Sequence, residues 1–253
     1  MKKLELKKYW KSEEQVAHIK GWDFSYIEGR FRSYEDELSW DYGEIVKEFL
    51  NAEANLLDID TGGGEILLSF QHPYNLTTVT EGYTPNVKLC EERLGRKGIR
   101  VCEVTDYANM PFEDNEFDVI LNRHGAYDIK ELYRILKPGG VFITQQVGED
   151  NDRELVKFLL PECEKLYQGM NLLVQKELFR NAGFDILMSQ EEYQPIEFYD
   201  VGALVWFARI IQWEFVNFSV EKCFSQLLEA QQLIEKEGCI KGRVHRYLIV
   251  ARK

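Results

Sequence analysis

The 253-residue sequence has few of the residues that build disulfide frameworks and metal sites. Its cysteines are odd in number and have no CxxC spacing, which argues against both kinds of site. The cysteines are Cys90, Cys102, Cys163, Cys223 and Cys239, and the histidines are His18, His72, His124 and His245. The histidines are far apart in the sequence, so we expect no metal. Reduced cysteines favour a cytoplasmic location.

The sequence also lacks a long hydrophobic run. The longest, residues 201–211, contains Arg209 and falls well short of the ~20 residues that cross a bilayer. The first residues, MKKLELKKYWK, are basic without the apolar stretch of a signal peptide. We therefore expect neither a signal peptide nor a membrane span.

Basic residues are too few to balance the acidic ones. The sequence has 31 Lys and Arg against 43 Asp and Glu, which gives a formal net charge of -12. A surface of this sign repels phosphate backbones, so nucleic acid is a disfavoured partner and a small-molecule substrate fits better. With 45% hydrophobic residues the chain can form a core, and its oligomeric state is left open.

Short β-like runs alternate with helical segments from residue 54 to residue 147. The expected strands are 55–59, 76–80, 99–104, 117–121 and 141–147, and the expected helices are 85–97 and 128–136, the second ended by residues 137–140. Downstream we expect helices at 153–160 (capped by residues 151–152), 174–182 and 220–234, with strands at 184–190 and 243–252. Such alternation predicts an α/β protein with a parallel sheet covered by helices on both faces.

Residues 1–50 differ from the rest of the sequence. They are rich in charge and contain Trp10, Trp22 and Trp40, without a strand pattern. We interpret them as a helical extension packed on the sheet or as a lid, with the tryptophans either filling space or serving the site. No linker or repeat divides the remainder, so residues 51–253 form one expected domain.

A glycine turn follows the first expected strand. The sequence LLDIDTGGGE runs from buried apolar residues through Asp58 and Asp60 into Gly62, Gly63 and Gly64. A strand, tight turn and helix start of this kind let the main chain approach a cofactor closely. By themselves, glycines at such a turn are often only a steric necessity.

Acidic residues follow the next two expected strands. Glu81 ends the second strand, where a carboxylate can accept hydrogen bonds from a ribose diol. Asp106 and Tyr107 follow the third strand, where an acid can bind an adenine amine while neighbouring side chains pack on the ring. Alternatively, Glu81 is a solvated strand-end charge and Asp106 caps a local turn.

With the later motifs MPFEDNEFD (residues 110–118) and LKPGG (residues 136–140), this order and spacing resembles the class I S-adenosylmethionine-dependent methyltransferases. The resemblance covers residues 54–147 well. It implies a Rossmann-like, doubly wound, mostly parallel sheet of seven strands, the last antiparallel, and S-adenosyl-L-methionine as cofactor. It further implies that Asp58, Gly62 and Gly64 surround the methionyl part of the cofactor. Glu81 would bind the ribose and Asp106 the adenine, and Asn122 and Arg123 would border the sulfonium.

The sequence departs from this family's glycine pattern at one position. The usual form is acidic-x-Gly-x-Gly-x-Gly, and Asp60 occupies the first glycine position. Its side chain either turns away from the ligand or meets it. An additional carboxylate near a sulfonium and an ammonium is electrostatically tolerable, and it can equally weaken binding by crowding.

Methyl transfer from a sulfonium needs orientation more than a catalytic group. His124 is the candidate for acid–base chemistry because imidazole takes a proton near neutral pH; its alternative is a structural histidine. Tyr127, Gln145 and Gln146 are candidates for orienting the acceptor, since ligands bind beyond the carboxyl ends of strands in open α/β sheets.

Aromatic residues gather before the last expected helix. They either shape the acceptor pocket or pack in the core; they are Phe198, Tyr199, Trp206, Phe207, Trp213, Phe215 and Phe218.

Two other functions compete with methyl transfer. A nicotinamide dehydrogenase has the fingerprint G-x-G-x-x-G, which started at Gly62 needs glycine where Leu67 stands. A protein that binds an adenosyl ligand without transferring a methyl group, as a sensor or interaction module, is the other alternative.

Overall fold

The computed structural model describes residues 2–18 and 23–253. Trp22 lies outside these residues. The described chain divides into two compact units. We call Ser39–Gly148, Gly169–Glu191 and Arg246–Lys253 the sheet unit, and the described residues up to Leu38 together with Glu149–Gln168 and Glu192–His245 the helical unit.

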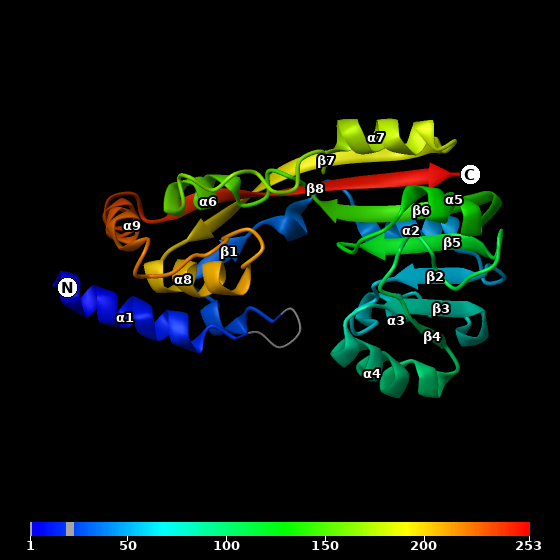
Figure 1. Ribbon diagram of the computed structural model, residues 1–253, viewed down its shortest axis with the longest axis horizontal. Helices are drawn as coiled ribbons and strands as arrows, with labels where there is room; N and C mark the ends of the chain where they lie inside the picture. Colours follow the sequence, from blue (N-terminus) through cyan, green and yellow to red (C-terminus); the bar gives the residue numbers. More distant parts are fainter. Residues whose placement is uncertain (1, 19–22) are drawn as a thin grey trace. The chain divides into compact units, whose positions relative to one another are not determined.

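The sheet unit contains five parallel strands that alternate with helices (Figure 1). The strands are β2 (Leu56–Ile59), β3 (Thr77–Glu81), β4 (Arg100–Glu103), β5 (Phe117–Arg123) and β6 (Leu136–Val147). The helices are α2 (Tyr42–Phe49), α3 (Glu65–Ser69), α4 (Thr84–Arg93), α5 (Ile129–Ile135) and α7 (Leu172–Asn181), with 3-10 turns η3 (Tyr74–Leu76) and η4 (Gly95–Lys97). Parallel pairing joins β4 to β3, β3 to β2, β2 to β5 and β5 to β6. The predicted α/β class is confirmed.

Two long strands, β7 (Asp185–Phe198) and β8 (Ile240–Arg252), contain residues of both units. β8 pairs antiparallel with β6, as expected of the last strand. The hydrogen-bonding order is β1-β7-β8-β6-β5-β2-β3-β4, so the described sheet has eight strands where the sequence indicated seven. The additional strand is β1 (Phe31–Ser33), which pairs antiparallel with the end of β7 and so supplies hydrogen-bond partners to its edge.

The register of the parallel strands brings their carboxyl ends to one edge. Ile59 at the end of β2 is opposite Asn122 on β5, and Arg123 is opposite Gln145 on β6. Glu81, the last residue of β3, is two residues beyond the pairing of β3 with β2, which ends at Val79. The residues expected to bind cofactor and acceptor therefore follow neighbouring strands.

Helices α5 and α7 cover one face of these strands. Leu132 and Ile135 of α5 and Phe179 of α7 belong to one buried cluster with Ile120 and Phe142 of the sheet. The rings of Phe142 and Phe179 stack with centroids 5.7 Å apart. This packing fixes the strands whose ends carry the site.

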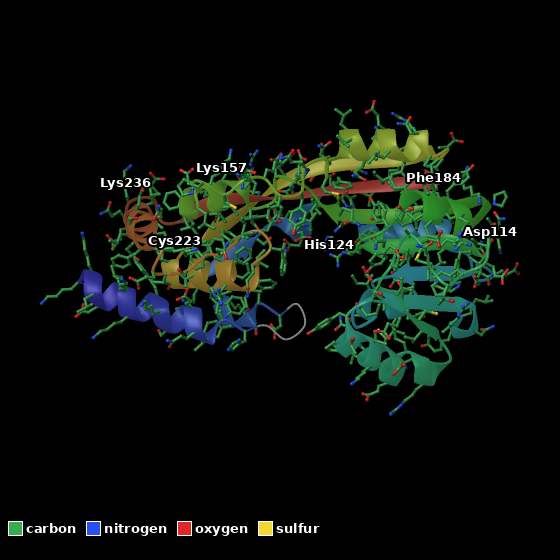
Figure 2. All side chains as sticks on the ribbon, viewed as in Figure 1. Asp114, His124, Lys157, Phe184, Cys223 and Lys236 are labelled. Atoms are coloured by element: carbon green, nitrogen blue, oxygen red, sulfur yellow. The ribbon has the colours of Figure 1, made fainter. Side chains whose placement is uncertain are left out.

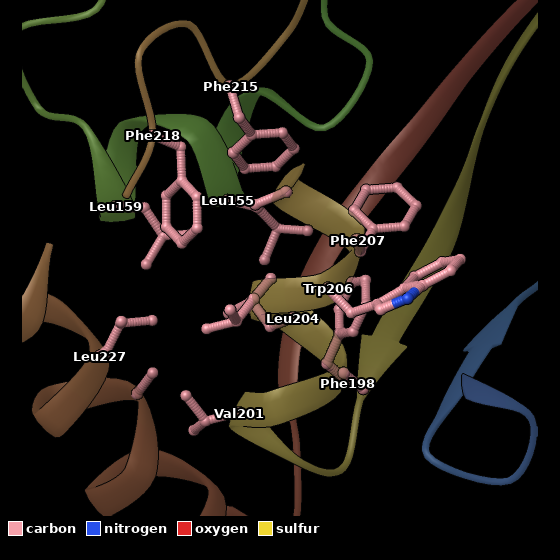
Figure 3. Packing of buried hydrophobic residues seen from close by; sticks show 14 of the residues in the cluster. Leu155, Leu159, Phe198, Val201, Leu204, Trp206, Phe207, Phe215, Phe218 and Leu227 are labelled. Carbon is pink, nitrogen blue, oxygen red and sulfur yellow. The ribbon is translucent and has the colours of Figure 1, made fainter. Parts of the chain in front are cut away.

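The helical unit has its own core around an apolar helix. Its elements are α1 (Lys3–Val16), η1 (Ser25–Ile27), β1, η2 (Glu35–Glu37), α6 (Arg153–Leu159), α8 (Val201–Ile210) and α9 (Phe224–Glu237). Figure 3 shows α8 and its neighbours contributing aromatic and aliphatic side chains to this core. Of the aromatic stretch noted in the sequence, Phe198, Trp206, Phe207, Phe215 and Phe218 are buried there, whereas Tyr199 and Trp213 are exposed.

Two local expectations need correction. Residues 137–140 do not form a turn between helix and strand, because α5 ends at Ile135 and β6 begins at Leu136. Asp152 is the N-cap residue of α6, as its position suggested, but it has a φ of 53° and no side-chain cap hydrogen bond.

Candidate functional site

The glycine turn after β2 is held by backbone hydrogen bonds and leaves space beside its main chain. The N–H of Thr61 donates to the carbonyl of Thr80 on β3, and the N–H of Gly64 to that of Thr61. Gly62 and Gly64 have φ values of 61° and 74°, in the left-handed region that favours glycine. A Cβ on Gly62 would have no atom within 4 Å. A ligand can therefore approach the backbone at Gly62.

Glu81 at the end of β3 faces this turn. Its side chain is only 6% exposed, and its Oε2 accepts a hydrogen bond from the N–H of Gly62 at 3.0 Å. Its Oε1 accepts from the N–H groups of Gly82 and Tyr83 at 3.1 and 3.2 Å. A weaker contact of 3.4 Å joins Oε2 to Nδ2 of Asn86. The backbone therefore fixes the direction of this carboxylate.

Asp58 lies in β2 beside the turn. Burial, with smaller contributions from the carboxylates of Asp60 and Glu81, raises the pKa of its carboxyl to about 7, although a hydrogen bond with Thr61 acts to lower it. Asp58, Asp60 and Glu81, with the glycine turn between them, form what we call the edge site. Its carboxylates hold negative charge in partly dehydrated surroundings.

Asp60 links three segments at the edge site. Both of its carboxylate oxygens lie 2.7 Å from Oη of Tyr107, which follows β4, and Oδ2 accepts from the N–H of Ala126 at 3.2 Å. A Cβ on Gly125 would be 2.7 Å from Oδ2 of Asp60. Position 125 thus needs glycine because the Asp60 side chain occupies the adjacent space.

Asn122, the buried residue near the end of β5, is fixed by its neighbours. Its Nδ2 donates to the carbonyl of Ile59 at 3.3 Å, and its Oδ1 accepts from Nε2 of Gln146 and from Oγ1 of Thr144. Nε2 of Gln146 also donates to the carbonyl of Gly125 at 3.1 Å. The amide of Gln146 thus orients the Asn122 segment.

His124 follows β5 with a φ of 61° and an exposed side chain (Figure 2). Its N–H donates to the carbonyl of Gln145, and its Nε2 lies 3.4 Å from Nε2 of Gln145. The side-chain oxygen of Gln145 accepts from the indole N–H of Trp40 at 2.8 Å. A buried tryptophan thus orients the glutamine that contacts His124.

Arg123 and Asp106 are less constrained by the fold. The side chain of Arg123 is exposed at the end of β5. Asp106 is exposed and accepts from the N–H of Ala108 and from Nδ2 of Asn109, and these hydrogen bonds lower its pKa, the one from Asn109 most. In this structure Asp106 therefore caps a local turn, which was one of its two interpretations.

Tyr127 borders a cavity of about 540 Å³ between residues 125–130 and helix α7. Its hydroxyl donates to Oε1 of Gln175 at 3.3 Å, and its ring packs edge-on against Phe142. Burial raises the pKa of Tyr127 to about 12. Met170, Gln175 and Leu178 line the opposite side of the cavity.

Several contacts at the edge site and near His124 were not expected from the sequence. Trp40 and Gly125 are the main ones, and Cys90 is another, because its buried thiol donates to the carbonyl of Gly62. Among residues 2–18 and 23–253, no group of three or more His, Cys, Asp or Glu side chains is arranged to hold a metal ion. In the same part of the chain, no helix has both the length and the apolarity required to span a bilayer.

An open parallel sheet with a glycine turn and acidic strand ends at one edge defines a Rossmann-like α/β protein. Residues 57–144 match the family described as the methyltransferase domain. The chain is 35% identical over 202 residues to the demethylmenaquinone methyltransferase of Staphylococcus saprophyticus, covering 73% of this chain and 79% of that protein. The chain belongs to the methyltransferase family.

Other known proteins are similar to this chain in part of their sequence or in fold. A sterol 4-C-methyltransferase of Caenorhabditis elegans is 31% identical over 147 residues, which are 52% of this chain and 43% of that protein. The chain thus spans less than half the length of the sterol enzyme. A solved structure from Bacillus halodurans, assigned as a methyltransferase, has the same fold with a TM-score of 0.58 and 18% identity over 84% of this chain and 98% of that one.

Proposed function

We propose that this methyltransferase uses S-adenosylmethionine bound at the edge site and transfers its methyl group to a small molecule. The observation that carries the proposal is the buried carboxylate of Glu81, fixed by backbone N–H groups beside a glycine turn with open space at Gly62. A carboxylate presented in this way suits a ribose diol. The long contact to Asn86 is the one that a ribose hydroxyl would replace.

The other cofactor contacts are proposed from the family resemblance. Asp58, Gly62 and Gly64 would surround the methionyl part, and Asn122 and Arg123 the sulfonium. Asp106 and Tyr107 would border the adenine, for which Asp106 must exchange its local hydrogen bonds. When bound, the cofactor supplies an electrophilic methyl group.

The acceptor is proposed to lie near residues 124–127. The cavity beside Tyr127 has a volume in the range of about 300–1,000 Å³ that small-molecule sites occupy. We propose that Tyr127, Gln145 and Gln146 help to orient the acceptor. Gln145 is the best supported of them because Trp40 fixes its amide. His124 would accept a proton where the acceptor atom must lose one.

Two assays test this proposal. Calorimetric titration with S-adenosylhomocysteine and with NAD distinguishes methyltransferase from dehydrogenase, and we expect binding of the first ligand only. A labelled-methyl assay on fractionated metabolites, RNA and protein should then label the metabolite fraction. Adenosyl-ligand binding without label in any fraction would support the sensor alternative, and binding of NAD alone would overturn the proposal.

We also propose that residues 1–50 and 51–253 are separate parts, and that the protein is cytoplasmic. Limited proteolysis with mass spectrometry tests the first point: a stable fragment beginning near residue 51 supports it. Cleavage confined to positions outside residues 39–60 contradicts it.

A further inference from the structure

The carboxylate of Asp60 is built into the edge site by specific features of this chain. Its φ of 57° lies in the left-handed region, which aspartate and asparagine tolerate better than most residues. Tyr107 donates to it from one side and the N–H of Ala126 from the other. Gly125 leaves the room that its side chain needs. The aspartate is therefore held in place.

The charged side chain that acts most on Asp60 is another carboxylate, that of Glu81. Burial raises its pKa, and the nearby Glu81 carboxylate raises it too, while the hydrogen bond from Tyr107 lowers it. Among the ion pairs of the described residues, none joins a Lys, Arg or His to Asp58, Asp60 or Glu81. Within the described residues, these carboxylates therefore have no ion-pair partner.

We propose that Asp60 makes the edge site favour the positively charged methyl donor over its neutral product. The inference rests on the proposed function. In the transfer, the bond between sulfur and the methyl carbon breaks with its electron pair left on sulfur, while the acceptor forms a bond to that carbon and releases a proton to His124 or to water. S-adenosylmethionine carries a sulfonium, an ammonium and a carboxylate, with a net charge of +1; S-adenosylhomocysteine has lost the sulfonium charge.

A carboxylate near the sulfur distinguishes these two ligands by charge alone. It attracts the sulfonium and has no comparable attraction for the thioether. Contacts to ribose and adenine stabilise both ligands equally and cannot produce this difference. Because product that binds less tightly leaves more readily, Asp60 would also reduce inhibition by S-adenosylhomocysteine.

The test compares dissociation constants for the two ligands at pH 8 by calorimetry. We expect Asp60→Asn to weaken binding of S-adenosylmethionine by about tenfold, the equivalent of ~1.4 kcal/mol, and to change S-adenosylhomocysteine binding little. Asparagine can keep the contact to Tyr107 and the positive φ. The matched control is Glu103→Gln, which removes a charge from the exposed end of β4, opposite Glu81, and should leave both constants unchanged.

A second variant separates charge from position. Tyr107→Phe removes a hydrogen bond to Asp60 but keeps its charge, so it should preserve most of the preference for the charged ligand. Equal losses for both ligands in Asp60→Asn, with unchanged thermal unfolding, would overturn the inference, because Asp60 would then only shape the turn. If neither ligand binds the wild-type protein, the proposed function itself fails.

Discussion

Oε2 of Glu81 lies 3.0 Å from the backbone nitrogen of Gly62, and this hydrogen bond joins the end of β3 to the turn after β2. Glu81→Gln should weaken binding of S-adenosylhomocysteine by about tenfold to a hundredfold, because the amide turns a donor toward backbone N–H groups and leaves one unpaired. Calorimetry measures the affinity. Glu103→Gln serves as the control, and an equal effect of both variants would contradict a specific role for Glu81.

The raised pKa of Asp58 predicts that the stability of the fold depends on pH. Its pKa of about 7 in the folded protein exceeds the ordinary value of 3.8, so between these values the folded chain keeps a proton that the unfolded chain has released. Its contribution to stability is therefore greatest at low pH, falls as pH rises toward 7, and is constant above that.

Asp58→Asn removes this dependence. We expect the variant's free energy of unfolding, relative to wild type, to rise by ~2–3 kcal/mol between pH 5 and pH 7.5 and then to level off. Urea unfolding at four pH values from 5 to 8.5 measures it. Two stability curves that stay parallel across this range would show that Asp58 does not titrate there.

The sequence alone was sufficient to predict the parts of the site that are formed by residues close to one another in the sequence. The strand before Asp60, the glycines after it and the strand ending in Glu81 follow from local patterns of apolar residues and turns, and the structure has them within one or two residues. Parallel pairing then places successive strand ends at one edge, so their proximity was predictable.

The remaining contacts depend on residues that are distant in the sequence. Trp40 meets Gln145 across 105 positions, and nothing near either residue indicates the pairing. Gly125 is required because the side chains of Asp60 and Asn122 lie against it, and the sequence around position 125 does not show this. Helix α8 was not predicted because its buried residues surround the helix and leave no amphipathic period.

If the acceptor binds in the cavity beside Tyr127, a change in the lining of this cavity should impair acceptor turnover without changing cofactor affinity. Leu178 of α7 is 45% exposed and lines this cavity, whereas Leu173 on the same helix is 75% exposed and outside it. Leu178→Trp should fill the space and lower turnover of the acceptor by at least about tenfold, because a displaced acceptor loses its alignment with the methyl group. Affinity for S-adenosylhomocysteine should stay unchanged.

Leu173→Trp is the control, since it adds the same ring to α7 on the solvent side. Steady-state kinetics with the acceptor found in the labelling assay, together with calorimetry, provides both readouts. Normal turnover in Leu178→Trp would show that the acceptor binds elsewhere.

The hydrogen bond from Trp40 to Gln145 predicts that a change at Trp40 lowers turnover less than a change at His124 does. His124→Ala should lower kcat by ~10²-fold or more if the acceptor loses its proton to the imidazole, with cofactor affinity little changed. Trp40→Phe keeps the aromatic ring but leaves the buried oxygen of Gln145 without this donor, so the amide can turn away from His124. Its kcat should lie between those of wild type and His124→Ala.

The double variant Trp40→Phe/His124→Ala tests whether Trp40 affects turnover only through His124. If Trp40 acts only by orienting Gln145 toward His124, then Trp40→Phe should lower kcat no further once His124 is alanine. Trp213→Phe, which changes an exposed ring of the helical unit, controls for the loss of an indole. Fully additive losses of kcat in the double variant would mean that Trp40 supports the sheet unit independently of His124. If His124→Ala lowers cofactor affinity as much as it lowers kcat, the histidine would be assigned to cofactor binding instead of acceptor chemistry.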